Sequence, residues 1–121
     1  MVEQVRRFTK GDTQVSVFAE LFTANGKPLD MATIVGATSK FRMVNAATAA
    51  VKVNGSAAVI VSAGGTVNGV ATPALVRYDW AALDIDTVAT YWAWFIITDG
   101  NGKTQHFPSG RGFQINVVDE V

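Results

Sequence analysis

The sequence contains no cysteine and one histidine, and each scarcity excludes a class of site. Without cysteine, the chain has no disulfides, iron–sulfur clusters, thiolate zinc sites or cysteine nucleophiles. A single histidine, His106, excludes a multi-histidine metal site, and no Gly-x-Ser-x-Gly elbow accompanies it. Because His106 lies in an expected strand, we interpret it as a half-exposed structural residue. We therefore predict that the protein is not an enzyme and has no catalytic residues, metal site or cofactor.

The sequence also lacks a charge excess and long apolar runs. Ten Lys and Arg residues balance ten Asp and Glu residues, whereas nucleic-acid binders and polybasic membrane-surface proteins usually have a basic excess. The apolar runs are too short to cross a bilayer, and no apolar stretch of a signal peptide follows the basic pair Arg6-Arg7. We expect a soluble protein, made without signal-dependent export, that binds neither nucleic acid nor membrane.

Alternation of apolar and polar residues predicts β-strands along most of the 121 residues. Hydrophobic residues make up 49% of the chain, which suits one globular domain. We expect strands at residues 13–22, 37–44, 74–80, 90–98, 103–107 and 113–117, with two more short strands around a hairpin turn at Asn54-Gly55. The predicted fold is an all-β antiparallel sandwich of seven or eight strands over residues 13–121, preceded by an N-terminal arm at residues 1–12.

The acidic residues Asp79, Asp84 and Asp86 form a cluster in the sequence. Asp84-x-Asp86 is similar to part of a calcium loop, but the glycine and the distal glutamate of an EF-hand are missing. A turn role before the strand at 90–98 is therefore the favoured interpretation.

Three stretches of the C-terminal half carry a resemblance to a known family. They are Val76-Arg-Tyr-Asp-Trp80, then Asp84-Ile-Asp-Thr-Val-Ala-Thr-Tyr91 with residues 92–99, then His106-Phe-Pro108 leading to Phe113-Gln-Ile-Asn-Val117. Together they resemble the immunoglobulin-like domain at the N-terminus of phage baseplate upper proteins and of related virion proteins. Residues 8–12 and 36–42 agree more loosely with the same family.

The resemblance implies an immunoglobulin-like fold and a non-enzymatic role in a phage virion. It implies an adaptor or assembly module in a tail, baseplate, neck or capsid surface, made in the host cytoplasm. Its partners would be other virion proteins, through self-association or a multi-subunit ring or array.

Tyr91 begins a strand directly after the corner at residues 84–87, where a sandwich places a tyrosine corner. We expect its hydroxyl to bond to backbone a few residues upstream, and the alternative is a core tyrosine without such a bond. Trp80 and Phe95 are the other residues to which we assign a structural role.

The outward face of the strand at 90–98 is the main candidate for an interface. If Tyr91 and Phe95 point inward, alternation sends Trp92, Trp94 and Ile96 outward as an apolar patch, which usually marks an interaction site. Further interface candidates are Phe18 and Phe22, expected to extend this patch, and Val5 and Phe8, expected to anchor the arm on a neighbour.

Two alternatives to this interface remain open. In one, the chain's own segments cover the patch, namely residues 64–72 or the arm. In the other, the protein is a carbohydrate-binding module in which Trp92 and Trp94 stack on sugar rings.

Overall fold

The computed structural model describes residues 5–23, 25–31, 34, 36–108 and 112–119. These residues contain no α-helix and form ten strands. The strands are β1 (Val5–Thr9), β2 (Ser16–Leu21), β3 (Thr38–Asn45), β4 (Val51–Ser62), β5 (Gly65–Val67), β6 (Val70–Thr72), β7 (Ala74–Asp79), β8 (Ala89–Thr98), β9 (Thr104–Phe107) and β10 (Phe113–Val118). The predicted all-β class is confirmed. The structure has more strands than expected because β1 forms within the predicted arm and the segment before β7 forms the hairpin β5–β6, whereas the two short strands expected around residues 54–55 are the single strand β4.

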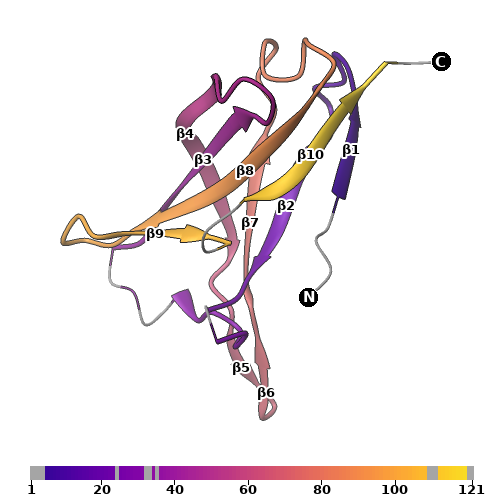
Figure 1. The fold of residues 1–121 in the computed structure, drawn as a ribbon. Coiled ribbons are helices and arrows are strands. Elements are labelled where there is room, and N and C mark those ends of the chain that lie inside the picture. Colours follow the sequence, from indigo (N-terminus) through magenta and orange to yellow (C-terminus); the bar gives the residue numbers. More distant parts are fainter. Residues whose placement is uncertain (1–4, 24, 32–33, 35, 109–111, 120–121) are drawn as a thin grey trace.

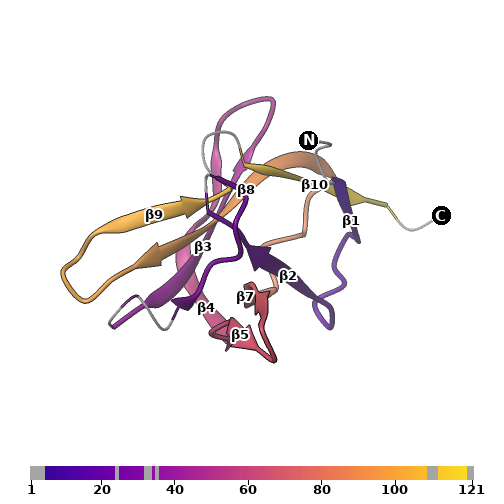
Figure 2. The same ribbon diagram turned by 90° about the horizontal axis from the view of Figure 1, so that it is seen from below.

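Eight of the strands form one curled sheet in the order β1-β10-β8-β3-β4-β7-β2, with β9 paired to β8, and β5 and β6 form a separate two-stranded sheet (Figure 1). We call β1, β10, β9, β8, β3 and the first part of β4 layer A, and the last part of β4 with β7 and β2 layer B. The long strand β4 belongs to both layers because its first residues pair with β3 and its last residues with β7. Figure 2 shows the curl, with β10, β8 and β3 on one side and β7 and β2 on the other. This arrangement is consistent with a β-sandwich in the broad sense.

The pairing is antiparallel except between β1 and β10, which run parallel. The sequence predicted an arm at residues 1–12, but residues 5–9 extend the domain's own sheet as an edge strand. Residues 13–15, expected at the start of the first strand, instead form a turn between β1 and β2, and Val15 is exposed. This turn connects β1 and β2, which lie at opposite ends of the strand order.

The prediction of a hairpin turn at Asn54-Gly55 is wrong. Gly55 has a positive φ of 71°, but it lies inside β4 at a β-bulge, where the pairing with β3 shifts between Phe41 and Arg42. A glycine in the left-handed region suits a bulge as well as a turn. The Asn68-Gly69 pair, at φ values of 52° and 79°, does make the tight turn of the hairpin β5–β6.

The core lies between the two layers and is rich in aromatic side chains. Phe41 of layer A stacks on Tyr78 of layer B with ring centroids 4.5 Å apart, and Phe95 lies 5.1 Å from Phe41. Trp80 presents an edge-on contact to Phe8 at 5.1 Å. The expected alternation holds in β8, since Tyr91, Ala93, Phe95 and Ile97 are buried while Trp92, Trp94 and Ile96 are half-buried on the outer side.

Candidate functional site

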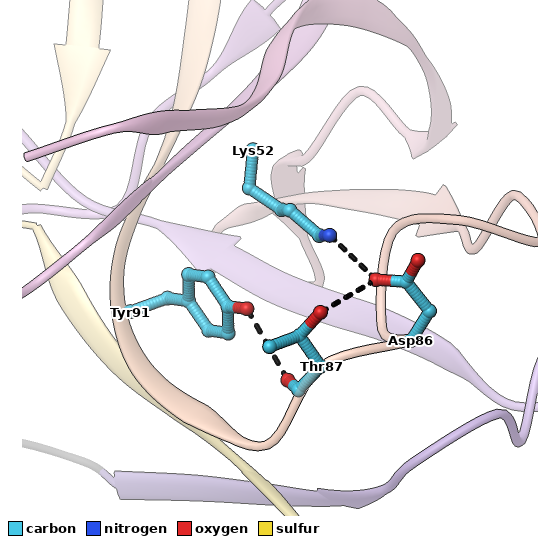
Figure 3. Close-up of polar contacts among 4 residues, drawn as sticks. All are labelled: Lys52, Asp86, Thr87 and Tyr91. Atoms are coloured by element: carbon cyan, nitrogen blue, oxygen red, sulfur yellow. Dashed lines mark hydrogen bonds and ion pairs between the residues drawn. The ribbon is translucent and has the colours of Figure 1, made fainter.

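The corner between β7 and β8 fixes the start of β8. Tyr91 donates a hydrogen bond from its hydroxyl to the backbone carbonyl of Thr87, with 3.2 Å between the oxygens (Figure 3). This bond confirms the expected upstream contact and is the geometry of a tyrosine corner. Lys52 of β4 reaches the same corner, and its Nζ donates a hydrogen bond to Oδ1 of Asp86 at 2.5 Å. The same oxygen accepts a bond from the Thr87 hydroxyl. The hydrogen bond from Lys52 is the main cause that lowers the pKa of Asp86.

Asp84 has the turn role that the sequence favoured. One of its carboxylate oxygens accepts bonds from the Ala81 amide at 2.8 Å and from the Tyr78 hydroxyl at 2.5 Å. Burial, followed by this contact with Asp84, raises the pKa of Tyr78 to about 12. In the part of the chain that the structure describes, no three His, Asp or Glu side chains are grouped to hold a metal ion. His106 is exposed on β9 opposite Ile96.

The outer face of layer A is centred on the two tryptophans of β8. Trp92 lies between Gln114 of β10 and Val44 of β3, and Trp94 lies beside Arg42 of β3. Because paired residues of neighbouring strands point to the same side of a sheet, these side chains surround the indoles. We use the name tryptophan face for ten outward residues of layer A on and around the two indoles, namely Arg7, Lys40, Arg42, Val44, Trp92, Trp94, Ile96, His106, Gln114 and Asn116.

Trp94 also rests against the backbone of the neighbouring strand. Gly112 directly precedes β10 and is buried, and a Cβ there would lie 2.9 Å from Cε2 of Trp94 and 2.4 Å from the carbonyl oxygen of Ala93. Only glycine fits this close approach. The indole is therefore held in place by its own domain, which accounts for part of its burial.

The described residues of the segments expected to cover the tryptophans lie elsewhere. β1 joins layer A at its edge beside β10, so it widens the sheet instead of crossing its face. The hairpin β5–β6 continues from β4 and β7 and projects away from β8 (Figure 1). Residues 1–4 of the expected arm and residues 109–111 lie outside the described part of the chain.

The more exposed apolar surface lies on the outer side of layer B. Its members are Phe18 (46% exposed), Phe22 (46%), Val59 (42%) and Val61 (45%), together with the half-buried Leu75. The strand register places Phe18 and Val59 on either side of Arg77 in one row across β2, β7 and β4. We call this surface, with Glu20, Arg77 and Asp79, the phenylalanine face. Contiguous apolar surface of this kind is typical of interaction sites.

The structure corrects the expected extension of the tryptophan patch by Phe18 and Phe22. The strands β3, β4 and β7 separate β2 from β8, so the phenylalanine and tryptophan faces belong to different layers. Val59 and Val61 also belong to this exposed surface, although the sequence did not indicate them as interface candidates. Their β-branched run indicated a strand, but only the pairing of β4 with β7 shows which sides face solvent.

The N-terminal candidates are partly accounted for within the domain. Phe8 packs on Trp80 and on the core, so its ring is engaged by its own chain. The side chain of Val5 lies outside the described part of the structure. Arg6 closes the gap between the layers: its guanidinium donates to the Phe18 carbonyl and lies 4.8 Å from the centre of the Phe113 ring. Burial lowers the pKa of Arg6.

Comparisons with known proteins give no assignment: no family model, no curated protein and no solved structure matches the chain. Within the described residues, no helix is long and apolar enough to span a bilayer.

Proposed function

We propose that the protein is a non-enzymatic structural module of a phage virion, a small immunoglobulin-like sandwich that packs against neighbouring subunits through its outer sheet faces. The observation that carries the assembly role is the exposed apolar surface of Phe18, Phe22, Val59 and Val61. Leaving such side chains in water costs free energy that a neighbouring subunit would recover on binding.

The virion setting rests on the resemblance of residues 76–117 to the immunoglobulin-like domain of baseplate upper proteins. The hydrogen bond from Tyr91 to Thr87 supports the immunoglobulin-like part of this proposal, since sandwiches of that kind carry a tyrosine corner at the start of a late strand. The parallel pairing of β1 with β10 differs from the antiparallel sandwich expected from the sequence. We treat β1 as an edge strand added to an immunoglobulin-like domain.

Quantitative mass spectrometry of purified phage particles, including induced prophage particles, tests this function. We expect the protein in the particles at a fixed copy number. A few to a few dozen copies would place it in the tail, baseplate or neck, and hundreds of copies would place it on the capsid surface. Absence from the particles would overturn the proposed virion function.

Polar surroundings of the tryptophans favour a second candidate, a carbohydrate-binding module. Sugar sites combine aromatic platforms with converging polar groups. The structure places Gln114 beside Trp92 and Arg42 beside Trp94, both on the outer side of layer A. The sequence alone indicated only apolar neighbours on this face.

The substitution Trp94→Lys separates the two functions. If the face packs on other subunits, the variant should lose assembly; if it binds sugar, its oligomeric state should stay unchanged while retention on a glycan array is lost. Thr66→Lys is a matched control, because Thr66 is exposed on β5, in the hairpin that projects away from β8. Circular dichroism must show that both variants are folded, since Trp94 contacts Gly112.

A further inference from the structure

The tryptophan and phenylalanine faces differ in charge. Arg7, Lys40 and Arg42 lie on the tryptophan face, and the described strand residues on that side include no Asp or Glu. On the phenylalanine face, Arg77 forms an ion pair with Asp79 at 2.9 Å, which leaves Glu20 as the unbalanced charge. The net charge of the protein is zero, but the charges are unevenly placed. The tryptophan face carries three cations, and the phenylalanine face combines apolar surface with the acid Glu20.

The charge pattern disfavours two-fold pairing through the tryptophan face. In an isologous contact the same patch meets itself, so residues near the axis face their own copies. Lys40 and Arg42 lie on β3 directly beside Ile96 and Trp94, in the middle of that face. Bringing these cations together in a desolvated contact would be repulsive, because like charges across an interface are costly.

A contact between unlike faces has the opposite character. Glu20 of β2 lies between the outward Phe18 and Phe22, which directly follows the strand, so this segment presents an acid flanked by two aromatic rings. Along β3 and β8, Arg42 lies beside Trp94. Placed face to face, these strands would match aromatic with aromatic surface and Glu20 with Arg42 or Lys40.

We propose that the protein self-assembles head to tail, with the tryptophan face of one copy docking on the phenylalanine face of the next. This inference deepens the proposed virion function by naming the partner as a second copy of the chain. Contacts between two different patches of one molecule close into a ring when the rotation allows it and otherwise extend as a filament. Either product is built from the same pair of faces.

Charge reversal tests the contact by sedimentation velocity of the full chain, over a range of protein concentrations at low ionic strength. We expect the wild-type protein to associate, and Glu20→Lys and Arg42→Glu each to weaken association by about tenfold or more. Raising the salt concentration should weaken the wild-type contact as well, because exposed charges are screened.

Mixing the two variants gives the decisive measurement. Each variant keeps one wild-type face, so the Arg42 face of one can bind the Glu20 face of the other, and the two reversed faces also match. The mixture should therefore associate where each variant alone does not. If the mixture remains as weak as its components, or if Glu20→Lys associates like wild type, the head-to-tail contact is overturned.

Matched variants control for folding and for total charge. Lys40→Glu repeats the reversal on β3 at an exposed residue and avoids the bond that Arg42 makes to Asn54 at 3.3 Å. Lys103→Glu and Asp12→Lys change charge by the same amounts in exposed connections between strands, and they should associate as wild type does. Thermal unfolding of each variant shows that the domain is intact.

The outcome is separable from the proposed virion function. A wild-type chain that remains monomeric at the highest concentration overturns head-to-tail assembly but leaves docking on a different virion protein in place. Absence of the protein from phage particles overturns the virion function, whatever the oligomeric state in solution. An association that Trp94→Lys abolishes but both charge reversals leave unchanged would assign the interface to the tryptophan face alone and overturn the pairing with the phenylalanine face.

Discussion

The hydroxyl of Tyr91 is bound to the carbonyl of Thr87, four residues earlier in the chain, and this bond ties the start of β8 to the corner before it. Tyr91 is 1% exposed, so the hydroxyl has little access to water. Burial also raises the pKa of Tyr91, so its hydroxyl stays protonated to a higher pH than an exposed tyrosine.

We expect Tyr91→Phe to lower the free energy of unfolding by about 1 kcal/mol, because it removes one buried hydrogen bond and keeps the ring. Urea denaturation followed by tryptophan fluorescence measures the change. Thr87→Ala is the matched control: it retains the carbonyl that accepts the bond, and we expect it to stay within about 0.5 kcal/mol of wild type. Equal stability of Tyr91→Phe and wild type would show that the corner bond contributes nothing.

Tyr78 should ionise only at strongly alkaline pH. Burial and the bond to Asp84 raise its pKa to about 12, so absorbance at 295 nm should show it titrating well above the usual value near 10. In Asp84→Asn the amide oxygen still accepts the Ala81 bond while the negative charge is gone, and the pKa of Tyr78 should fall. No movement of this titration would mean that the carboxylate of Asp84 does not act on Tyr78.

The same ionisation predicts how stability depends on pH. Because the pKa of Tyr78 is higher in the folded state, its contribution is fully present below about pH 10, the unfolded pKa, and is lost as the pH rises towards about 12. The wild-type protein should therefore lose more unfolding free energy between pH 9 and pH 11 than Tyr78→Phe does. Chemical denaturation at the two pH values provides the comparison.

Gly55 should resist substitution although its surroundings are open. A Cβ at this position would meet only Cδ of Lys40 at 3.9 Å, but the φ of 71° lies in the left-handed region, which costs free energy for alanine. Gly55→Ala should cost about 1 kcal/mol or more of unfolding free energy. Thr66→Ala, at an exposed residue of β5, is the control and should change stability by less than about 0.5 kcal/mol. A stable Gly55→Ala would show that the bulge can relax.

Gly55 also shows which parts of the fold local sequence can predict. The Asn54-Gly55 pair correctly indicates a positive φ, but a hairpin turn and a bulge both satisfy it. The outcome depends on β3, which pairs with β4 on both sides of the glycine. Strand pairing of this kind is non-local, so the dipeptide alone does not determine it.

The candidate surfaces also combine local features, which the sequence predicts, with non-local features, which it does not. Alternation predicted that Trp92 and Trp94 point away from the core, and it predicted the same for Phe18, because side-chain direction in a strand is a local property. Whether Phe18 adjoins the tryptophans depends on strand order, and three strands intervene. The corner bond of Tyr91 was predictable because both of its ends lie within one short segment.

The phenylalanine face should tolerate polar substitution. Phe18 and Phe22 are each 46% exposed, so Phe18→Thr with Phe22→Thr removes apolar surface that already lies largely in water. Threonine also suits a strand. We expect the unfolding free energy to change by less than about 1 kcal/mol, while binding of a hydrophobic dye to the folded protein falls.

Val17→Thr provides the matched control on the inward side of the same strand. Val17 is 1% exposed, between Ser16 and Phe18. A hydroxyl there would be buried among apolar side chains without a hydrogen-bond partner, and we expect it to lower the free energy of unfolding by about 1–3 kcal/mol. Dye binding should not fall in this variant. The Phe18 and Phe22 substitutions could instead destabilise the domain as much as Val17→Thr does. In that case the two rings contribute to the stability of their own domain, and their face is not a surface available to a neighbouring subunit.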